Sequence, residues 1–232
     1  MKVPTALVLA AVLALGPSSA QAEVTVVEDW AQQAVGAKGI PAGWTTYETV
    51  GGRPTYDFTV VEDDGRRALR LKSRDEHSTI TKEIRVNLRA TPILEWRWKA
   101  VTLPAGADVR RWETSDLTGH IFVGWPRFPA LLRTRLIGYA WDTTAPAQTM
   151  QRSRKTGTVT FFIVRSGPRE LNQWLTERRN VYEDYKQAFG EEPGDPRVVA
   201  LSIDTNDTHS VAEALIGRII FTTAAAEPRA NR

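Results

Sequence analysis

Apolar and polar residues alternate with a period of two along most of this chain, and this period predicts β-strands. In the run "PILEWRWKAV", Leu94, Trp96 and Trp98 fall on one face while charged residues occupy the other. Roughly ten such runs are separated by turn signals, of which Asp64-Gly65 is a strong hairpin signal. The pattern predicts a mainly β protein, a jelly-roll-like antiparallel β-sandwich with Trp96 and Trp98 in its core.

One segment near the C-terminus departs from this period. On a helix of 3.6 residues per turn, "RELNQWLTERRNVYEDYKQAFG" places Trp174, Tyr185 and Phe189 on one face and charged residues on the other. Gly190 suits the left-handed position that follows a helix end. We therefore predict one amphipathic α-helix over residues 170–189, which lies across the sandwich and closes one side of it.

The first residues have the order of a secretory signal. Lys2 precedes the apolar run "ALVLAAVLALG", and Ala20-Gln21-Ala22 matches a cleavage site. The run is shorter than the roughly 20 residues that cross a bilayer. We expect a signal peptide over residues 1–22, export to the periplasm or beyond, a single domain over 23–223 and a disordered tail over 224–232. An uncleaved anchor is the alternative for the first segment, and no membrane span is expected in the mature chain.

The amino-acid composition excludes several kinds of site and partner. The absence of cysteine excludes a disulfide framework, a thiolate zinc site and a cysteine nucleophile. The 30 Lys and Arg residues nearly balance the 27 Asp and Glu residues, and no basic tail occurs, so nucleic acid is not an expected partner. Eight tryptophans are many for this length, and exported β-proteins use tryptophan both in the core and against sugar rings.

Two stretches resemble a known family. The stretch "QWLTERRNVYEDYKQAFGEEP", followed by "VVALSIDTNDTHSVAEALIGRIIF", resembles the C-terminal signature of domain of unknown function 3047, found in uncharacterised exported bacterial proteins. "PILEWRWKA" with "LPAGAD" resembles its central motif. The resemblance implies export and a sandwich-like fold, but no activity. It also leads us to expect an arginine in the central strand where this chain has His120.

The charged run "RRNVYEDY" is the first candidate site. Arg178, Asn180 and Asp184 fall at one edge of the expected helix, and an arginine offers a planar fork to carboxylate or sulfate. These residues can bind a polar or anionic ligand beside the helix. Alternatively, Arg178 and Asp184 form ion pairs that fix the helix to the sheet, because structural networks use the same groups. Both interpretations remain open.

Aromatic residues near loops form the second candidate. Trp125 and Trp141 can stack on the flat faces of sugar rings, or they can belong to the core. Together with export and the sandwich pattern, they favour a non-catalytic binding module for a carbohydrate or cell-envelope glycan. A structural envelope protein without a small ligand is one alternative.

The catalytic alternative is a sandwich-type polysaccharide lyase. In that reading Arg97 neutralises a uronate carboxylate, while His120 or Tyr139 transfers protons. No serine-centred elbow, P-loop or dinucleotide fingerprint occurs in the sequence. The sequence therefore favours a binding protein over an enzyme, and it leaves the oligomeric state open.

The turn "IDTNDT" is the one candidate for a metal. Asp204, Asn206 and Asp207 offer oxygen ligands at a spacing that suits Ca²⁺, although the glycine and distal glutamate of an EF-hand are missing. Asp and Asn also favour turns without a metal, because their side chains bond the local backbone. No other metal or cofactor is expected.

Overall fold

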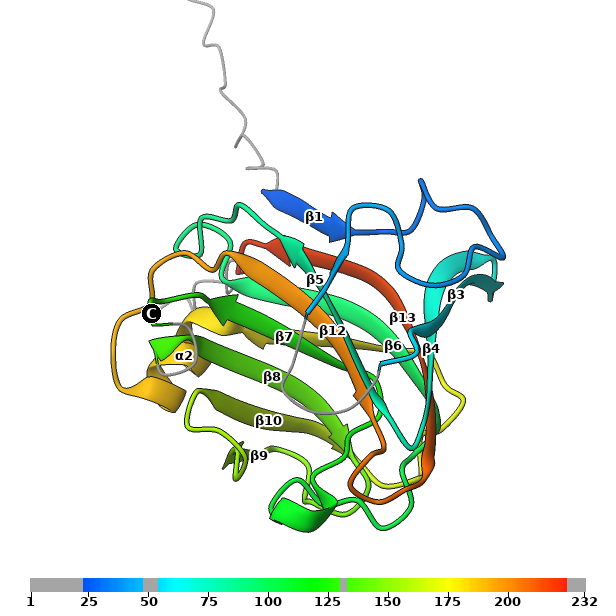
Figure 1. The fold of residues 1–232 in the computed structure, drawn as a ribbon. Coiled ribbons are helices and arrows are strands. Elements are labelled where there is room, and N and C mark those ends of the chain that lie inside the picture. Colours follow the sequence, from blue (N-terminus) through cyan, green and yellow to red (C-terminus); the bar gives the residue numbers. More distant parts are fainter. Residues whose placement is uncertain (1–22, 48–53, 130–132, 225–232) are drawn as a thin grey trace, which may run out of the picture.

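Two β-sheets pack face to face in the computed structural model, which describes residues 23–47, 54–129 and 133–224 (Figure 1). The expected signal peptide lies outside the described residues, as does all but the first residue of the expected tail. One sheet has six strands in the order β11-β6-β13-β4-β3, with β1 paired to β13. The other has seven strands in the order β2-β5-β12-β7-β8-β10-β9. The predicted sandwich is thereby confirmed.

The strands of the six-stranded sheet are β1 (Val24–Glu28), β3 (Asp57–Asp63), β4 (Arg66–Arg74), β6 (Ile93–Thr102), β11 (Leu175–Asn180) and β13 (Val211–Thr222). Those of the seven-stranded sheet are β2 (Thr45–Thr46), β5 (His77–Glu83), β7 (His120–Trp125), β8 (Arg135–Asp142), β9 (Thr149–Arg152), β10 (Val159–Ser166) and β12 (Val198–Asp204). A short 3-10 helix, η1 (Trp112–Thr114), and the α-helix α2 (Val181–Phe189) complete the described elements. None of the helices in the described residues has the length and apolar character needed to cross a membrane.

One neighbouring pair departs from the antiparallel pattern, because β8 and β10 run parallel. After β8 the chain passes the position of β10 and forms β9 at the sheet edge. It then turns back, and β10 pairs antiparallel with β9. Strand β10 lies between β8 and β9 and therefore runs in the same direction as β8.

The tryptophans of β6 lie in the core between the sheets, as their alternation predicts. Trp96 and Trp98 are each 1% exposed. Trp96 stacks on Tyr139 of the opposite sheet with ring centroids 5.2 Å apart, and Trp98 lies 5.7 Å from Trp141. Each fully buried aromatic side chain contributes roughly 1.5–3 kcal/mol through the removal of apolar surface from water.

The predicted helix is only partly correct. Its second half is α2, which begins after Asn180 and ends at Gly190 with a left-handed φ of 71°. Residues 175–180 instead form strand β11, which pairs antiparallel with β6 at the edge of the six-stranded sheet. The side chain of Asn180 accepts a hydrogen bond from the Glu183 amide (3.2 Å), which caps the first turn of α2.

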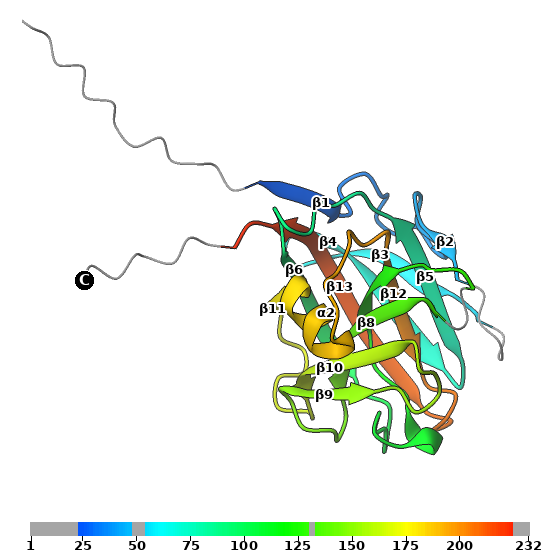
Figure 2. The ribbon, with the colours of Figure 1, turned by 90° about the vertical axis from the view of Figure 1, so that its left-hand side faces the viewer.

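The helix α2 closes one side of the sandwich, as expected (Figure 2). It contacts β6 and β11 of one sheet and β8 of the other. Tyr185 is fully buried, and its ring lies 4.6 Å from that of Trp125. The helix thus covers the end of the core that the two sheets leave open.

Candidate functional site

A groove of about 660 Å³ lies on the outer face of the six-stranded sheet. The residues that line it come from the loop after β1, the start of β4, and strands β6, β11 and β13: Asp29, Ala31, Arg66, Arg67, Glu95, Trp96, Arg97, Thr176, Gly217, Arg218 and Ile220. Glu95 and Arg97 identify the face, because they alternate with the core residues of β6. The groove runs across neighbouring strands.

A bulge in β13 forms the floor of this groove. The register between β13 and β6 shifts between Ile216 and Ile219, and β13 pairs with β4 before the shift and with β1 after it. Gly217 lies in the bulge. A Cβ atom there would lie 3.2 Å from the Arg97 Cβ and 3.4 Å from the Trp174 ring, so glycine permits the close approach of both side chains.

Trp174 and the β3–β4 hairpin hold Arg97 in place. The guanidinium of Arg97 and the ammonium of Lys99 lie 5.0 Å and 5.2 Å from the centroid of the Trp174 ring. The Trp174 indole donates to Asp63 Oδ1 (2.7 Å), and Lys99 Nζ donates to the same oxygen (2.5 Å). These hydrogen bonds from Lys99 and Trp174 hold the pKa of Asp63 below its usual value. Because Asp63 ends β3, the contacts also bind the hairpin to the outer face of β6.

The wall formed by the loop after β1 is anchored by the buried carboxylate of Glu28. Its Oε1 accepts from the amides of Asp29 (3.1 Å) and Trp30 (2.9 Å). Its Oε2 accepts from the Trp44 indole (2.9 Å) and from Lys82 Nζ (2.8 Å). The Trp30 indole in turn donates to the Gly217 carbonyl (2.9 Å), and this hydrogen bond connects the loop after β1 to the bulge of β13.

The four arginines of the groove differ in their contacts. Arg67 Nη1 donates to two uncharged acceptors, the carbonyls of Ala31 (2.6 Å) and Gln33 (3.0 Å). Arg97 Nη2 lies 3.9 Å from Asp64 Oδ2. In the described part of the chain, the side chains of Arg66 and Arg218 have neither a hydrogen-bonded nor an ion-paired partner.

The charged run predicted to form a site does not converge on one cleft. Arg178 points to the outer face, where it is 50% exposed and pairs with Glu95. Asn180 caps α2. Asp184 faces the interior and is 5% exposed. Arg178 and Asp184 therefore lie on opposite sides of β11 and do not pair with each other; their role in binding a ligand stays a prediction.

The interior partner of Asp184 is Arg179, which belongs to the same run "RRNVYEDY". Arg179 Nε and Nη2 donate to Asp184 Oδ2 (2.9 Å) and Oδ1 (2.5 Å), and the Tyr139 hydroxyl donates to Oδ2 (2.8 Å). Burial opposes the charge of Arg179, but the hydrogen bond and charge of Asp184 raise its pKa. Burial and then the Asp184 carboxylate raise the pKa of Tyr139 well above its usual value. The arrangement is a satisfied interior network.

Trp125 and Trp141, proposed as sugar platforms, lie in the core. Trp125 is 5% exposed and donates through its indole to the Gly194 carbonyl (2.8 Å). Trp141 is 1% exposed and donates to the Gly167 carbonyl (3.0 Å). Neither ring presents a face to solvent, so their burial matches the alternative of a core role.

The residues of the lyase alternative lie in three different layers. Arg97 is on the outer face of the six-stranded sheet, and Tyr139 is between the sheets. His120 lies on the other face of the seven-stranded sheet, with its ring 4.9 Å from Phe122 and 6.2 Å from Phe161. Burial lowers the pKa of His120 to about 4, so the ring is neutral at pH 7. The structure does not bring these three side chains to a common site.

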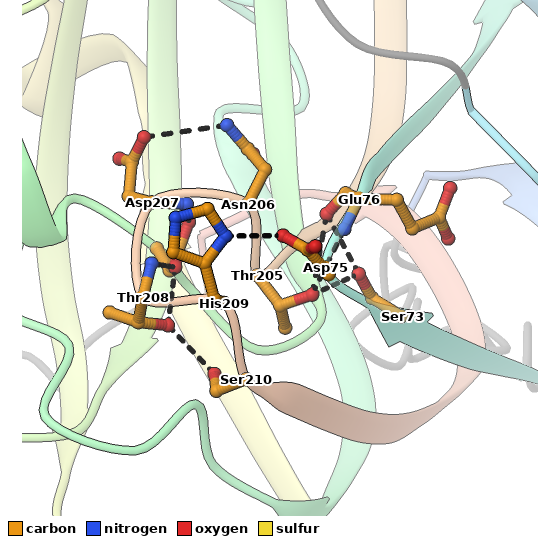
Figure 3. Close-up of polar contacts among 10 residues, drawn as sticks. Ser73, Asp75, Glu76, Thr205, Asn206, Asp207, Thr208, His209 and Ser210 are labelled. Atoms are coloured by element: carbon orange, nitrogen blue, oxygen red, sulfur yellow. Dashed lines mark hydrogen bonds and ion pairs between the residues drawn. The ribbon is translucent and has the colours of Figure 1, made fainter.

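The turn that follows β12 is held by hydrogen bonds within the protein (Figure 3). Asp204 Oδ1 accepts from the Leu117 amide (2.8 Å). Asp207 pairs with Lys155. His209, in the same turn, bonds Asp75 (2.7 Å), and the Asn206 amide donates to Asp207 Oδ1 (3.4 Å); Figure 3 draws both contacts. Across residues 23–47, 54–129 and 133–224, no group of three His, Cys, Asp or Glu side chains is arranged to hold a metal.

Comparisons with known proteins address the family and the fold. The model of a family described as protein of unknown function (DUF3047) matches residues 42–220. No curated protein sequence matches the chain.

Among solved structures, the chain is similar to a family 11 carbohydrate-binding module of a Clostridium thermocellum cellulosomal cellulase, with 7% identity, a TM-score of 0.45, and 88% and 96% of the two chains covered. It is also similar to a family 30 module of another cellulosomal cellulase from that organism, with 11% identity, a TM-score of 0.46, and 82% and 96% covered. Likeness at this level leaves function to be argued from the chain's own residues.

Proposed function

Because the chain belongs to the DUF3047 family of proteins of unknown function, its role rests on its own residues, and we propose that it is a non-catalytic carbohydrate-binding protein. The observation that carries this proposal is the groove on the outer face of the six-stranded sheet. Export through the N-terminal signal is part of the same proposal, because cell-envelope glycans lie outside the cytoplasm.

The shape of the groove suits a chain of sugars. It extends from Thr176 on β11 across β6 and β13 to Asp29 and Ala31 beyond β1. Neighbouring strands lie about 4.8 Å apart, so three strand spacings give a length of roughly 14 Å. A ligand that fills this length is a short oligosaccharide or part of a longer polymer.

The chemistry of the lining suits hydroxyl groups. Guanidinium groups donate hydrogen bonds, the Asp29 carboxylate accepts them, and the Thr176 hydroxyl does both. Gly217 and Ile220 give the floor an apolar part. Sites for small ligands combine such apolar surface with a few fixed polar groups.

Binding is favoured over catalysis because the proposed lyase residues share no site. Arg97 lines the groove, whereas Tyr139 and His120 are buried elsewhere in the sandwich. A proton acceptor must lie within hydrogen-bond reach of the proton that it removes. Neither buried side chain meets this condition for a ligand in the groove.

A glycan array followed by isothermal titration calorimetry tests the proposal. Thr176→Trp is the informative variant, because Thr176 is exposed and lies opposite Arg97 in the β11–β6 register. A large indole there either fills part of the groove or offers a stacking face to a sugar ring, so it should change the affinity for any glycan that the wild type retains.

The matched control is Met150→Trp. Met150 is 43% exposed on β9, at the edge of the other sheet. This variant should bind as the wild type does. The proposal fails if the wild type retains no glycan, or if Thr176→Trp and Met150→Trp bind it with equal affinity.

A further inference from the structure

We infer that the groove is selective for acidic glycans, whose sugars carry carboxylate or sulfate groups. This inference rests on the proposed function and names the class of glycan. It follows from the charges that line the groove, from the fixed position of Arg97 and from the arginines that lack partners.

The charges in the groove do not balance. Four arginines line it, against the carboxylates of Asp29 and Glu95. The Glu95 carboxylate is engaged by Arg178, outside the lining. Asp29 accepts a hydrogen bond from the nearby Ala31 amide (3.0 Å) and has no cationic partner in the described residues. Asp64, also outside the lining, lies 3.9 Å from Arg97, so Arg66, Arg67 and Arg218 carry the excess of positive charge, which favours an anionic ligand.

Arg97 has the geometry of a preorganised anion binder. Its guanidinium lies over the Trp174 ring, and its side chain is 21% exposed. The planar guanidinium matches two oxygens of a carboxylate or sulfate with two parallel hydrogen bonds. Because the stack on Trp174 already restricts this side chain, ordering it on binding costs little conformational entropy.

The other arginines place positive charge on the side of Arg97 that faces β13 and β4. Arg67 is held by the carbonyls of Ala31 and Gln33, which use its Nη1 but leave its charge uncompensated. Arg66 and Arg218 are exposed, and within the described ranges they have no acidic partner to displace. A polymer with a negative group on successive sugars can therefore meet several cations along the groove.

Calorimetric titrations with polygalacturonate and with a neutral mixed-linkage β-glucan test the inference. We expect tighter binding of polygalacturonate, and we expect that binding to weaken as sodium chloride is added, because salt screens exposed charges. Arg97→Gln should weaken polygalacturonate binding about tenfold, as expected for the loss of hydrogen bonds to a charged group. Arg218→Gln should weaken it about twofold to fivefold, as expected for an exposed ion pair.

Arg154→Gln is the matched control. Arg154 is exposed in the loop between β9 and β10, far from the groove in the fold, and no ion pair in the described part of the chain involves it. Its affinity should equal that of the wild type. Arg218 is also exposed, so its variant remains informative if Arg97→Gln lowers stability.

The outcomes separate the inference from the proposed function. Equal affinity for the two polymers, with no effect of Arg97→Gln or Arg218→Gln, would overturn acidic selectivity while leaving glycan binding intact. Failure of both polymers and of the array to bind would overturn the proposed function itself. If a DNA oligonucleotide bound as tightly as polygalacturonate, with the same response to the two variants, the groove would be a general polyanion site and not one for acidic glycans.

Discussion

Arg178 and Arg179 are neighbours in β11 but face opposite sides of the sheet, so glutamine substitutions should have very different effects. Arg179 donates two hydrogen bonds to Asp184 and lies 5.0 Å from the Phe162 ring. Its loss leaves the Asp184 carboxylate, 5% exposed, without a cation. Arg178 is 50% exposed and loses only its pairing with Glu95.

The magnitudes follow from burial. Removing one partner of a buried ion pair costs about 3–5 kcal/mol. The Arg179 side chain is 25% exposed, and Tyr139 still donates to Asp184 after the substitution, so we expect about 2–3 kcal/mol at this site. An exposed pair such as Arg178 with Glu95 is worth about 0–1 kcal/mol. At about 2–4 °C per kcal/mol for a domain of this size, Arg179→Gln should lower the melting temperature by about 5–10 °C, and Arg178→Gln by less than about 4 °C.

Thermal and urea unfolding followed by circular dichroism measure both variants. The double variant Arg179→Gln/Asp184→Asn adds a check, because residues in one network should show a coupling energy of about 0.5–3 kcal/mol. Equal melting temperatures for the two arginine variants would refute the register of β11 and the interior role of Arg179. If Asp184→Asn or Asn180→Ala instead kept its melting temperature and lost ligand affinity, the prediction of a binding site at these residues would hold.

Three further predictions concern the interior and the groove. Burial lowers the pKa of His120 to about 4, below the ordinary value near 6.5. The contribution of His120 to the free energy of unfolding is complete above pH about 6.5. It is lost as the pH falls from there through about 4, a total of about 3 kcal/mol. An NMR titration in which the His120 ring titrates near 6.5 would contradict this prediction. Glu28→Gln should cost about 1–3 kcal/mol, measured by urea unfolding, because Lys82 and the loop after β1 lose a charged acceptor; an unchanged unfolding midpoint would count against this anchor. Gly217→Ala should lower the free energy of glycan binding more than the free energy of unfolding, because the new Cβ lies against Arg97 in the groove. An unchanged calorimetric affinity would show that Arg97 has room to move.

The alternation in β6 was sufficient to predict its two faces, because apolar and charged residues strictly alternate there. The same reasoning failed for β11, where the inward positions after Leu175 are charged. Glu177 is 7% exposed and accepts from Arg165 Nε (2.7 Å) and from the Trp98 indole (3.1 Å). Arg179 points inward beside it. With Leu175 as the one apolar residue on the inward face of β11, hydrophobic periodicity was too weak to indicate a strand, and the predicted helix was extended too far toward the N-terminus.

The groove was not predictable from local patterns. Its lining residues run from Asp29 to Ile220, and they are brought together by the pairing of β13 with β1, β4 and β6 and of β6 with β11. One local signal was present, since Gly217 interrupts the apolar run "ALIGRIIF", and a glycine within a strand often marks a bulge or a close approach. That signal indicates a break in the strand, but it does not identify the arginines that meet there.

The distribution of paired and unpaired charge supports the proposed site on the outer face of the sandwich. Inside it, Arg179 is paired with Asp184, and Arg165 is paired with Glu177 and with the more exposed Glu170. A group that already makes its hydrogen bonds can bind a ligand only by breaking them, so these interior pairs serve stability. On the outer face, Arg218 has no acidic partner in the described residues and can bind a ligand without that cost. Substitutions of interior arginines should therefore change unfolding, whereas substitutions of groove arginines should change affinity.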